Sequence, residues 1–265
     1  MNRIDAIFRA LKERGEKALI PFITAWDPDL QTTEALALTL AARGADLIEL
    51  GIPFSDPLAD GPTIQAASSR ALKAGVHLTD VLELAGKLRP KIDIPLILMG
   101  YYNPILQYGL ERTAKDAARL GVDGFIIPDL PLEEAGPWRR AAVKAGLAPI
   151  MLAAPTSGEA RIKAMGRLTR GFLYYVSVTG ITGARTELPA DLAAALKEVR
   201  SLVDCPLAVG FGISTPQQVK WLAPYVDGIV VGSAIVQRVA KLRGKELLLE
   251  VGDFIAALKE PLKRR

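Results

Sequence analysis

Eight short apolar runs alternate with longer segments of helical periodicity, and this alternation constrains the fold more than any other feature of the sequence. A helix between two strands returns the chain to the same edge of a sheet, so the alternation predicts parallel strands. The predicted strands are Ala18–Thr24, Asp46–Leu50, Pro95–Met99, Gly124–Ile127, Ala148–Leu152, Gly171–Ser177, Pro206–Val209 and Gly228–Val231. Helical segments between them include Thr33–Arg43, Leu78–Lys87, Glu133–Lys144, Leu192–Leu202 and Gln217–Leu222.

Eight such units follow one another without a long linker or a change in composition, which favours one closed (β/α)8 TIM barrel over residues 1–265. An open, doubly wound sheet is the alternative. It would normally show fewer strands and a Gly-x-Gly-x-x-Gly turn after the first strand, which this sequence lacks. Three further segments read as extra helices: Ile4–Arg14 at the N-terminus, Pro62–Ala74 in the long connection after strand two, and Glu246–Leu258.

Charge and cysteine content limit the environment and the partners. The net charge of +4 is spread along the chain, except for a cluster at 259–265 that a helix C-terminus favours, so we expect no nucleic acid partner. Cys205 is the single cysteine and cannot form an internal disulfide. The N-terminal segment is charged and no run of about 20 apolar residues occurs, so we expect a cytoplasmic protein without a membrane segment.

Glu49 stands inside the apolar second strand. Burying a carboxylate is costly unless it is paired or protonated. Strand alternation puts Leu47 and Glu49 on one face, which we expect to point into the barrel, where the chemistry of such folds lies at the carboxyl ends of the strands. A buried structural hydrogen bond is the plainer interpretation.

The loop that follows, residues 51–62, contains three prolines, two glycines and two aspartates. Prolines fix φ and stiffen a loop, which suits holding a side chain over a pocket. Asp60 is therefore a candidate site residue, with capping of the next helix as the alternative.

Glycine turns follow strands seven and eight, at Gly210–Gly212 and Gly232–Ser233, each just before a helix. Glycine lets backbone N–H groups approach an anion, and barrel enzymes recurrently hold phosphate after these two strands. Gly212, Gly232 and Ser233 are thus candidate phosphate ligands, although plain turn chemistry is also possible. Gly183, in the long loop after strand six, would add a further amide.

Other chemistries of this fold lack their residues. His77 is the only histidine, so a histidine-based metal site cannot form, and no lysine lies at a strand's carboxyl end for Schiff-base chemistry. Carboxylates remain as the acid and base groups, and we expect no metal and no cofactor.

The run Ile48–Gly61 resembles the signature of the tryptophan synthase alpha-subunit family, and further similarity extends over nearly the whole chain. The other matching segments are Pro21–Ala25, Leu98–Pro104, Ile127–Pro131, Tyr174–Arg185, Val209–Ile213 and Val231–Ala234. The resemblance implies cleavage of indole-3-glycerol phosphate to indole and glyceraldehyde 3-phosphate. It implies Glu49 as the general acid and base, Asp60 at the indole nitrogen, and Thr182 near that aspartate in a loop that closes over substrate. It also implies a beta subunit as partner in an alpha2beta2 complex.

Aromatic residues on or beside strands one, six and seven are candidates for holding the flat indole ring: Phe22, Tyr174 and Phe211. This role rests mainly on the resemblance, since strand aromatics are more often plain core. Of the tyrosine pair, we expect Tyr174 rather than Tyr175 to face inward. Met99 and Leu152 are weaker pocket candidates.

Trp26 departs from the family, which usually has glycine there, and Gly100 replaces a small polar residue. If position 26 requires a positive φ, tryptophan is strained, which puts the local loop geometry in question.

Three rival functions stay open at this point. A stand-alone lyase would release free indole without a partner. A catalytically silent barrel would only activate a beta subunit, and a phosphosugar-binding module would have no chemistry at all.

Overall fold

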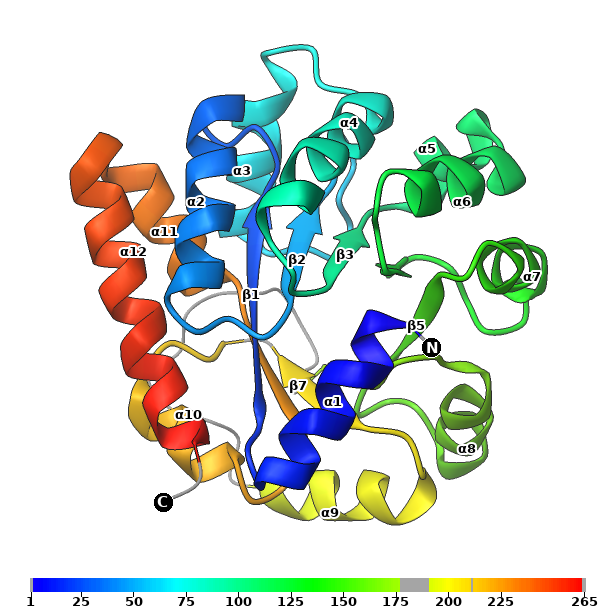
Figure 1. Cartoon of the computed structure of the whole chain (residues 1–265). Helices are drawn as coiled ribbons and strands as arrows, with labels where there is room; N and C mark the ends of the chain where they lie inside the picture. Colours follow the sequence, from blue (N-terminus) through cyan, green and yellow to red (C-terminus); the bar gives the residue numbers. More distant parts are fainter. Residues whose placement is uncertain (1, 177–190, 211, 264–265) are drawn as a thin grey trace.

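Eight parallel strands close into a barrel in the computed structural model, which describes residues 2–176, 191–210 and 212–263 (Figure 1). The strand order follows the sequence, and β8 pairs with β1 to close the ring. The strands are β1 (Ala18–Thr24), β2 (Ile48–Gly51), β3 (Leu96–Met99), β4 (Gly124–Ile126), β5 (Ala148–Ala153), β6 (Leu173–Val176), β7 (Leu207–Gly210) and β8 (Gly228–Val231). The predicted (β/α)8 barrel is confirmed, and each strand starts within two residues of its predicted start.

Helices surround the barrel, and the three extra helices predicted from the sequence are present as α1, α3 and α12. The helices are α1 (Arg3–Arg14), α2 (Leu30–Ala42), α3 (Pro62–Leu72), α4 (Leu78–Leu88), α5 (Tyr102–Tyr108), α6 (Leu110–Arg119), α7 (Gly136–Lys144), α8 (Glu159–Leu168), α9 (Leu192–Leu202), α10 (Pro216–Leu222), α11 (Ser233–Lys241) and α12 (Gly244–Lys259). Short 3-10 turns follow α4 and α12, at Arg89–Lys91 and Glu260–Leu262. In the part of the chain described, no helix is both long enough and apolar enough to cross a bilayer.

The core has two apolar layers, one inside the barrel and one between the strands and the helices. Helix α1 belongs to the inner layer, because its buried residues Ile4, Phe8 and Leu11 join the inward-facing strand residues. The ring of Phe8 lies 5.5 Å from that of Phe172, just before β6. The helix therefore closes the end of the barrel where the strands begin.

Side chains cap the starts of the strands in a repeating pattern. Shortly before every second strand, the side chain of one residue accepts a hydrogen bond from a backbone N–H group of the preceding strand. The pairs are Asp46 with Leu19 at 2.7 Å, Asp123 with Leu96 at 2.9 Å, Thr169 with Met151 at 3.1 Å, and Asp227 with Leu207 at 3.0 Å. We call these four residues the base caps.

The three aspartate caps also bind cations. Lys259, at the end of α12, lies 2.7 Å from the Asp46 carboxylate, and both side chains are buried. Arg3 pairs with Asp123 at 3.0 Å, and Arg200 with Asp227 at 2.7 Å. These ion pairs attach surrounding helices to the same end of the barrel.

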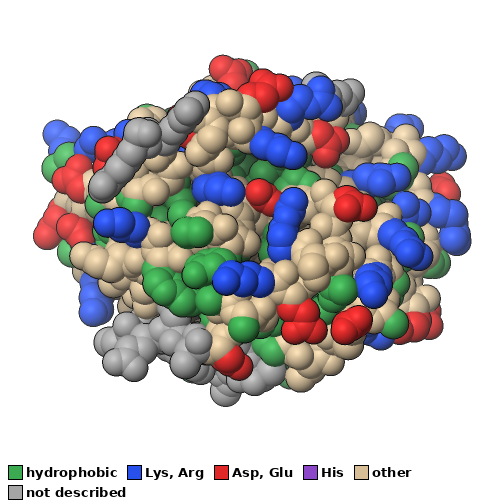
Figure 2. Space-filling view, turned by 90° about the horizontal axis from the view of Figure 1, so that it is seen from below, with side chains coloured by type: hydrophobic (Ala, Val, Ile, Leu, Met, Phe, Trp, Pro, Cys, Tyr) green, Lys and Arg blue, Asp and Glu red, His purple; other side chains and the backbone are tan. Residues whose placement is uncertain are grey.

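The face of the molecule seen from below in Figure 1 carries charges of both signs. Figure 2 shows lysine and arginine side chains distributed among aspartates and glutamates on this face, with apolar side chains between them.

The loop after β1 has unusual backbone geometry. Trp26 has a φ of +59°, so tryptophan occupies the left-handed conformation that glycine adopts more readily. The next residue, Asp27, is buried and receives two hydrogen bonds from Arg70 of α3, at 2.7 and 2.8 Å. This ion pair joins the loop to α3, which lines the cavity described next.

Candidate active site

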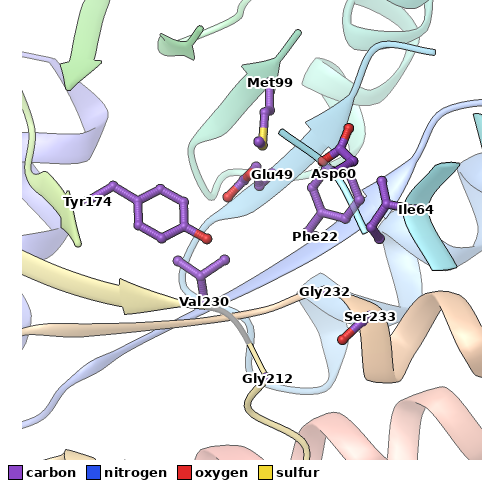
Figure 3. A pocket seen from close by; sticks show the side chains of 10 residues that line it. All are labelled: Phe22, Glu49, Asp60, Ile64, Met99, Tyr174, Gly212, Val230, Gly232 and Ser233. Carbon is purple, nitrogen blue, oxygen red and sulfur yellow. The ribbon is translucent and has the colours of Figure 1, made fainter. Parts of the chain in front are cut away.

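A cavity lies beside the carboxyl ends of the strands (Figure 3). Its wall combines two carboxylates, an apolar surface and two glycine turns. The residues that line it are Phe22, Glu49, Asp60, Ile64, Met99, Tyr174, Gly212, Val230, Gly232 and Ser233. In the view of Figure 3, Glu49 lies between Tyr174 and Asp60, while Gly212 and Ser233 occupy the opposite side from Met99.

Glu49 enters the cavity from β2, where it is paired with Phe22 of β1 and Ile97 of β3. Its side chain is only 1% exposed, and its Oε2 has no hydrogen-bond partner among the described residues. Burial, and secondarily the nearby charge of Asp60, raises the pKa of Glu49 to about 8. The carboxyl group is therefore protonated at neutral pH.

Asp60 reaches the cavity from the loop after β2. Its Oδ2 accepts a 2.9 Å hydrogen bond from the hydroxyl of Tyr101, which follows β3. Burial raises the pKa of Asp60 to about 6, although the hydrogen bond from Tyr101 opposes this rise. At pH 7 Asp60 is mostly ionised while Glu49 is protonated, so one cavity holds a carboxylic acid and a carboxylate.

The glycine turns form the polar end of the cavity. Gly212 has a φ of +78°, a conformation in which other residues are strained. Ser233 is the first residue of α11, and Gly232 precedes it. The first N–H groups of a helix lack partners within the helix and favour anions, so this end suits a phosphate group.

The apolar wall depends on two glycines that make room for aromatic rings. A Cβ atom on Gly51 would lie 2.5 Å from Cζ of Phe22, and one on Gly210 would overlap the ring of Tyr174. Tyr174 belongs to the inner layer and lines the cavity, whereas Tyr175 packs between the barrel and the helices. Phe22 and Tyr174 can therefore enclose a flat apolar ligand.

Most of the residues expected to form a site meet in this one cavity. They are Phe22, Glu49, Asp60, Tyr174, Gly212, Gly232 and Ser233, with Met99 as a further lining residue. Thr182, Gly183 and Phe211 lie outside the described residues. Leu152 does not line the cavity.

Sequence reasoning missed Ile64, Val230 and Tyr101. Val230 could have been found, because strand alternation places it two residues before Gly232. Ile64 follows the predicted loop by two residues at the start of α3. Tyr101 lies in the matched segment after strand three, but nothing local indicated its contact with Asp60.

Comparisons with known proteins agree with this geometry. The family model described as tryptophan synthase alpha chain matches residues 8–259. A tryptophan synthase alpha chain of Citrifermentans bemidjiense is 55% identical over 260 residues, covering 98% of this chain and 97% of the relative. The crystal structure of tryptophan synthase subunit alpha from Legionella pneumophila has a TM-score of 0.90 at 39% identity, covering 99% and 98% of the two chains. A chain in the structure of Mycobacterium tuberculosis tryptophan synthase has a TM-score of 0.92 at 33% identity, covering 100% and 99%. With a match of this extent, and the two carboxyl groups in one cavity, the chain belongs to the tryptophan synthase alpha chain family.

Proposed function

We propose that Glu49 and Asp60 carry out the family's reaction in this chain, the cleavage of indole-3-glycerol phosphate into indole and glyceraldehyde 3-phosphate. The observation that carries the proposal is the pair of carboxyl groups in one cavity, one protonated and one ionised at neutral pH. When the environments of two carboxyl groups give them different pKa values, the group with the higher pKa can donate a proton while the other stays charged.

In the first step, Glu49 donates its proton to C3 of the indole ring, which breaks the aromaticity of the five-membered ring. The ring nitrogen then carries positive charge, and the Asp60 carboxylate stabilises its N–H. The Oε2 of Glu49 is buried and has no hydrogen-bond partner in the described part of the chain, which suits it for this contact with substrate.

In the second step, the Glu49 carboxylate takes the proton of the hydroxyl on the carbon attached to C3. That carbon becomes the aldehyde carbon of glyceraldehyde 3-phosphate, and the electrons of the C–C bond return to the ring to give indole. Positioned acid–base catalysis of this kind contributes about 10²–10⁴-fold to a rate.

Binding energy from both ends of the substrate holds the reacting carbon near Glu49. Gly212, Gly232 and Ser233 are proposed to bind the phosphate through backbone N–H groups and the serine hydroxyl. Phe22 and Tyr174 are proposed to hold the indole ring. Thr182, Gly183 and Phe211 keep their proposed roles around the substrate on the strength of the family resemblance.

The chain acts in tryptophan biosynthesis, and its partner is the beta subunit of tryptophan synthase. We further propose that residues 1–265 act as one domain and that the enzyme works in the cytoplasm, which suits a chain whose single cysteine cannot form an internal disulfide.

The decisive experiment measures indole release from indole-3-glycerol phosphate by the purified chain, with and without a beta subunit. We expect release by the chain alone and a higher rate with the partner. Release unaffected by a beta subunit that does not bind would favour the stand-alone lyase. No release by either preparation would reject the proposed function, leaving a silent barrel or a phosphosugar-binding module.

The Glu49→Gln variant tests the assignment of the acid. It should lose indole release by at least about 10²-fold while binding a phosphorylated indole analogue that lacks the glycerol hydroxyls, as measured by calorimetry. The matched control is Glu83→Gln, which makes the same substitution on the exposed side of α4. Normal turnover by Glu49→Gln would contradict the assignment.

A further inference from the structure

Tyr101 is a buried tyrosine, 5% exposed, that meets the catalytic loop at three points. Its hydroxyl donates to Oδ2 of Asp60 at 2.9 Å and accepts the backbone N–H of Ala59 at 3.0 Å. Its ring stacks on that of Phe54, with centroids 5.0 Å apart and planes inclined by 23°. One side chain thus contacts the beginning and the end of the segment that carries Asp60.

The position of Tyr101 is itself fixed by the barrel. It follows β3 by two residues and precedes α5, whose first residue, Tyr102, donates its backbone N–H to Asp129 at 2.9 Å. Rigid strand and helix ends therefore support the ring and hydroxyl of Tyr101. The loop residues around Asp60 are more exposed, as Leu58 at 92% shows. The rigid partner in the contact is Tyr101, and the loop is the part being held.

Among the described residues, few groups other than Tyr101 could orient the Asp60 side chain or favour its charged form. In the described chain no lysine or arginine lies within ion-pair distance of it, and Tyr101 is the one hydrogen-bonding group that lowers its pKa. The remaining titratable neighbours are Glu49 and Tyr174, which share the cavity. The charge of Asp129 raises the pKa of Tyr101 and is not among the causes that shift the pKa of Asp60. Glu49 is protonated at neutral pH, so it adds little charge there.

We propose that Tyr101 is a positioning residue for the reaction: through its hydroxyl it aims the Asp60 carboxylate into the cavity and keeps it ionised. This inference rests on the proposed function of Asp60. Because burial would otherwise protonate Asp60, the phenol supplies the contact that leaves a charged carboxylate opposite the indole nitrogen. A hydrogen bond to a charged group changes an equilibrium by about tenfold or more, which is the size of effect expected here.

The test is the pH profile of indole release by Tyr101→Phe, which keeps the ring and its stacking on Phe54 but removes the hydroxyl. We expect the acid limb, set by Asp60, to move up by about one pH unit, from about pH 6 to about pH 7. The kcat should therefore fall about tenfold at pH 5 and about twofold at pH 7. KM should change by less than about twofold, because the phosphate turns and the aromatic wall are untouched. An acid limb and kcat equal to those of the wild type would overturn the inference.

The matched control is Tyr108→Phe. Tyr108 donates to Asp116 at 2.9 Å, the same pairing at the same distance, but neither residue lines the cavity. It should leave the pH profile unchanged. A purely structural role for Tyr101 would lower stability without moving the acid limb, and that result would also count against the proposal.

If Tyr101→Phe does not fold, 3-fluorotyrosine at position 101 keeps both ring and hydroxyl while making the hydroxyl a stronger donor. The acid limb should then move to lower pH, and movement upward or none would overturn the inference. The wild-type protein is assayed in parallel: if it releases no indole, the proposed function has failed, whereas an active wild type with an unshifted variant rejects the Tyr101 role alone.

Discussion

Replacing Glu49 by glutamine should abolish catalysis and yet stabilise the protein at alkaline pH. The pKa of Glu49 rises from 4.5 to about 8 on folding because the carboxyl group loses its hydration. A folded-state pKa above the unfolded one means that the contribution to stability is fully present below about pH 4.5 and is lost as pH rises through about 8. Glutamine fills nearly the same space and does not ionise.

The magnitude follows from the two pKa values. Between pH 5 and pH 8 the unfolded chain is mostly ionised at position 49, whereas the folded chain stays largely protonated until about pH 8. At about 1.36 kcal/mol per pH unit, this costs the wild-type protein about 3 kcal/mol of unfolding free energy over that interval. Glu49→Gln lacks this loss. The variant should therefore be more stable than the wild type by about 1 kcal/mol at pH 5 and by about 4 kcal/mol at pH 8.

The assay is urea unfolding followed by circular dichroism at both pH values, with the free energy extrapolated to water. Asp60 titrates in both proteins, so its contribution largely cancels in the comparison. The exposed Glu83→Gln serves as the control and should follow the wild type at both pH values. If Glu49→Gln and the wild type lose the same free energy between pH 5 and pH 8, Glu49 is not desolvated as described and the acid role proposed for it fails.

Three further predictions concern other parts of the molecule. Plotted against pH, kcat/KM for indole release should be bell-shaped with limbs near the pKa values of Asp60 and Glu49, about 6 and about 8, and a single limb would contradict the paired roles. Gly212 has a φ of +78°, so Gly212→Ala should lower the unfolding free energy by about 1–2 kcal/mol and should also raise KM. Gly75 has a similar φ of +72° but lies away from the cavity, so Gly75→Ala should lower the unfolding free energy and leave KM unchanged. Lys259→Met leaves the buried carboxylate of Asp46 without its cation, so the unfolding free energy should fall by about 3 kcal/mol while kcat of the folded enzyme stays unchanged. Urea unfolding and steady-state kinetics measure these two quantities.

The barrel could be predicted because its signal is local. Strand composition and helical periodicity are properties of neighbouring residues, and Ala18–Thr24 and Leu192–Leu202 occur with the predicted bounds. Helix α7 shows the limit of this reasoning. It was predicted from Glu133 but begins at Gly136, with Pro137 in its first turn, where proline is best tolerated.

The candidate site was predictable where a residue stands out from its surroundings. Glu49 could be identified because it is the ionisable residue within an apolar strand. Gly232 could be identified because it directly follows β8, where barrel enzymes recurrently bind phosphate. The pairing of Tyr101 with Asp60 joins residues 41 positions apart, and it depends on how the loop after β2 packs against the end of β3. No periodicity within either segment encodes that contact, so only the structure could reveal it.

The base caps divide the ring into four strand pairs. Within each pair, a side-chain hydrogen bond from a base cap links the two strands. Between pairs, the strand starts are linked by backbone hydrogen bonds, such as those from Ile48 N–H to the carbonyl of Pro95 and from Ala148 N–H to the carbonyl of Asp123. A gene rearranged so that its new termini fall between two pairs, for example in the segment that joins β4 to β5, would keep every reinforced junction within a continuous stretch of chain. We therefore expect the barrel to fold best as circular permutants with termini between two pairs, or as two half-barrels expressed as separate polypeptides.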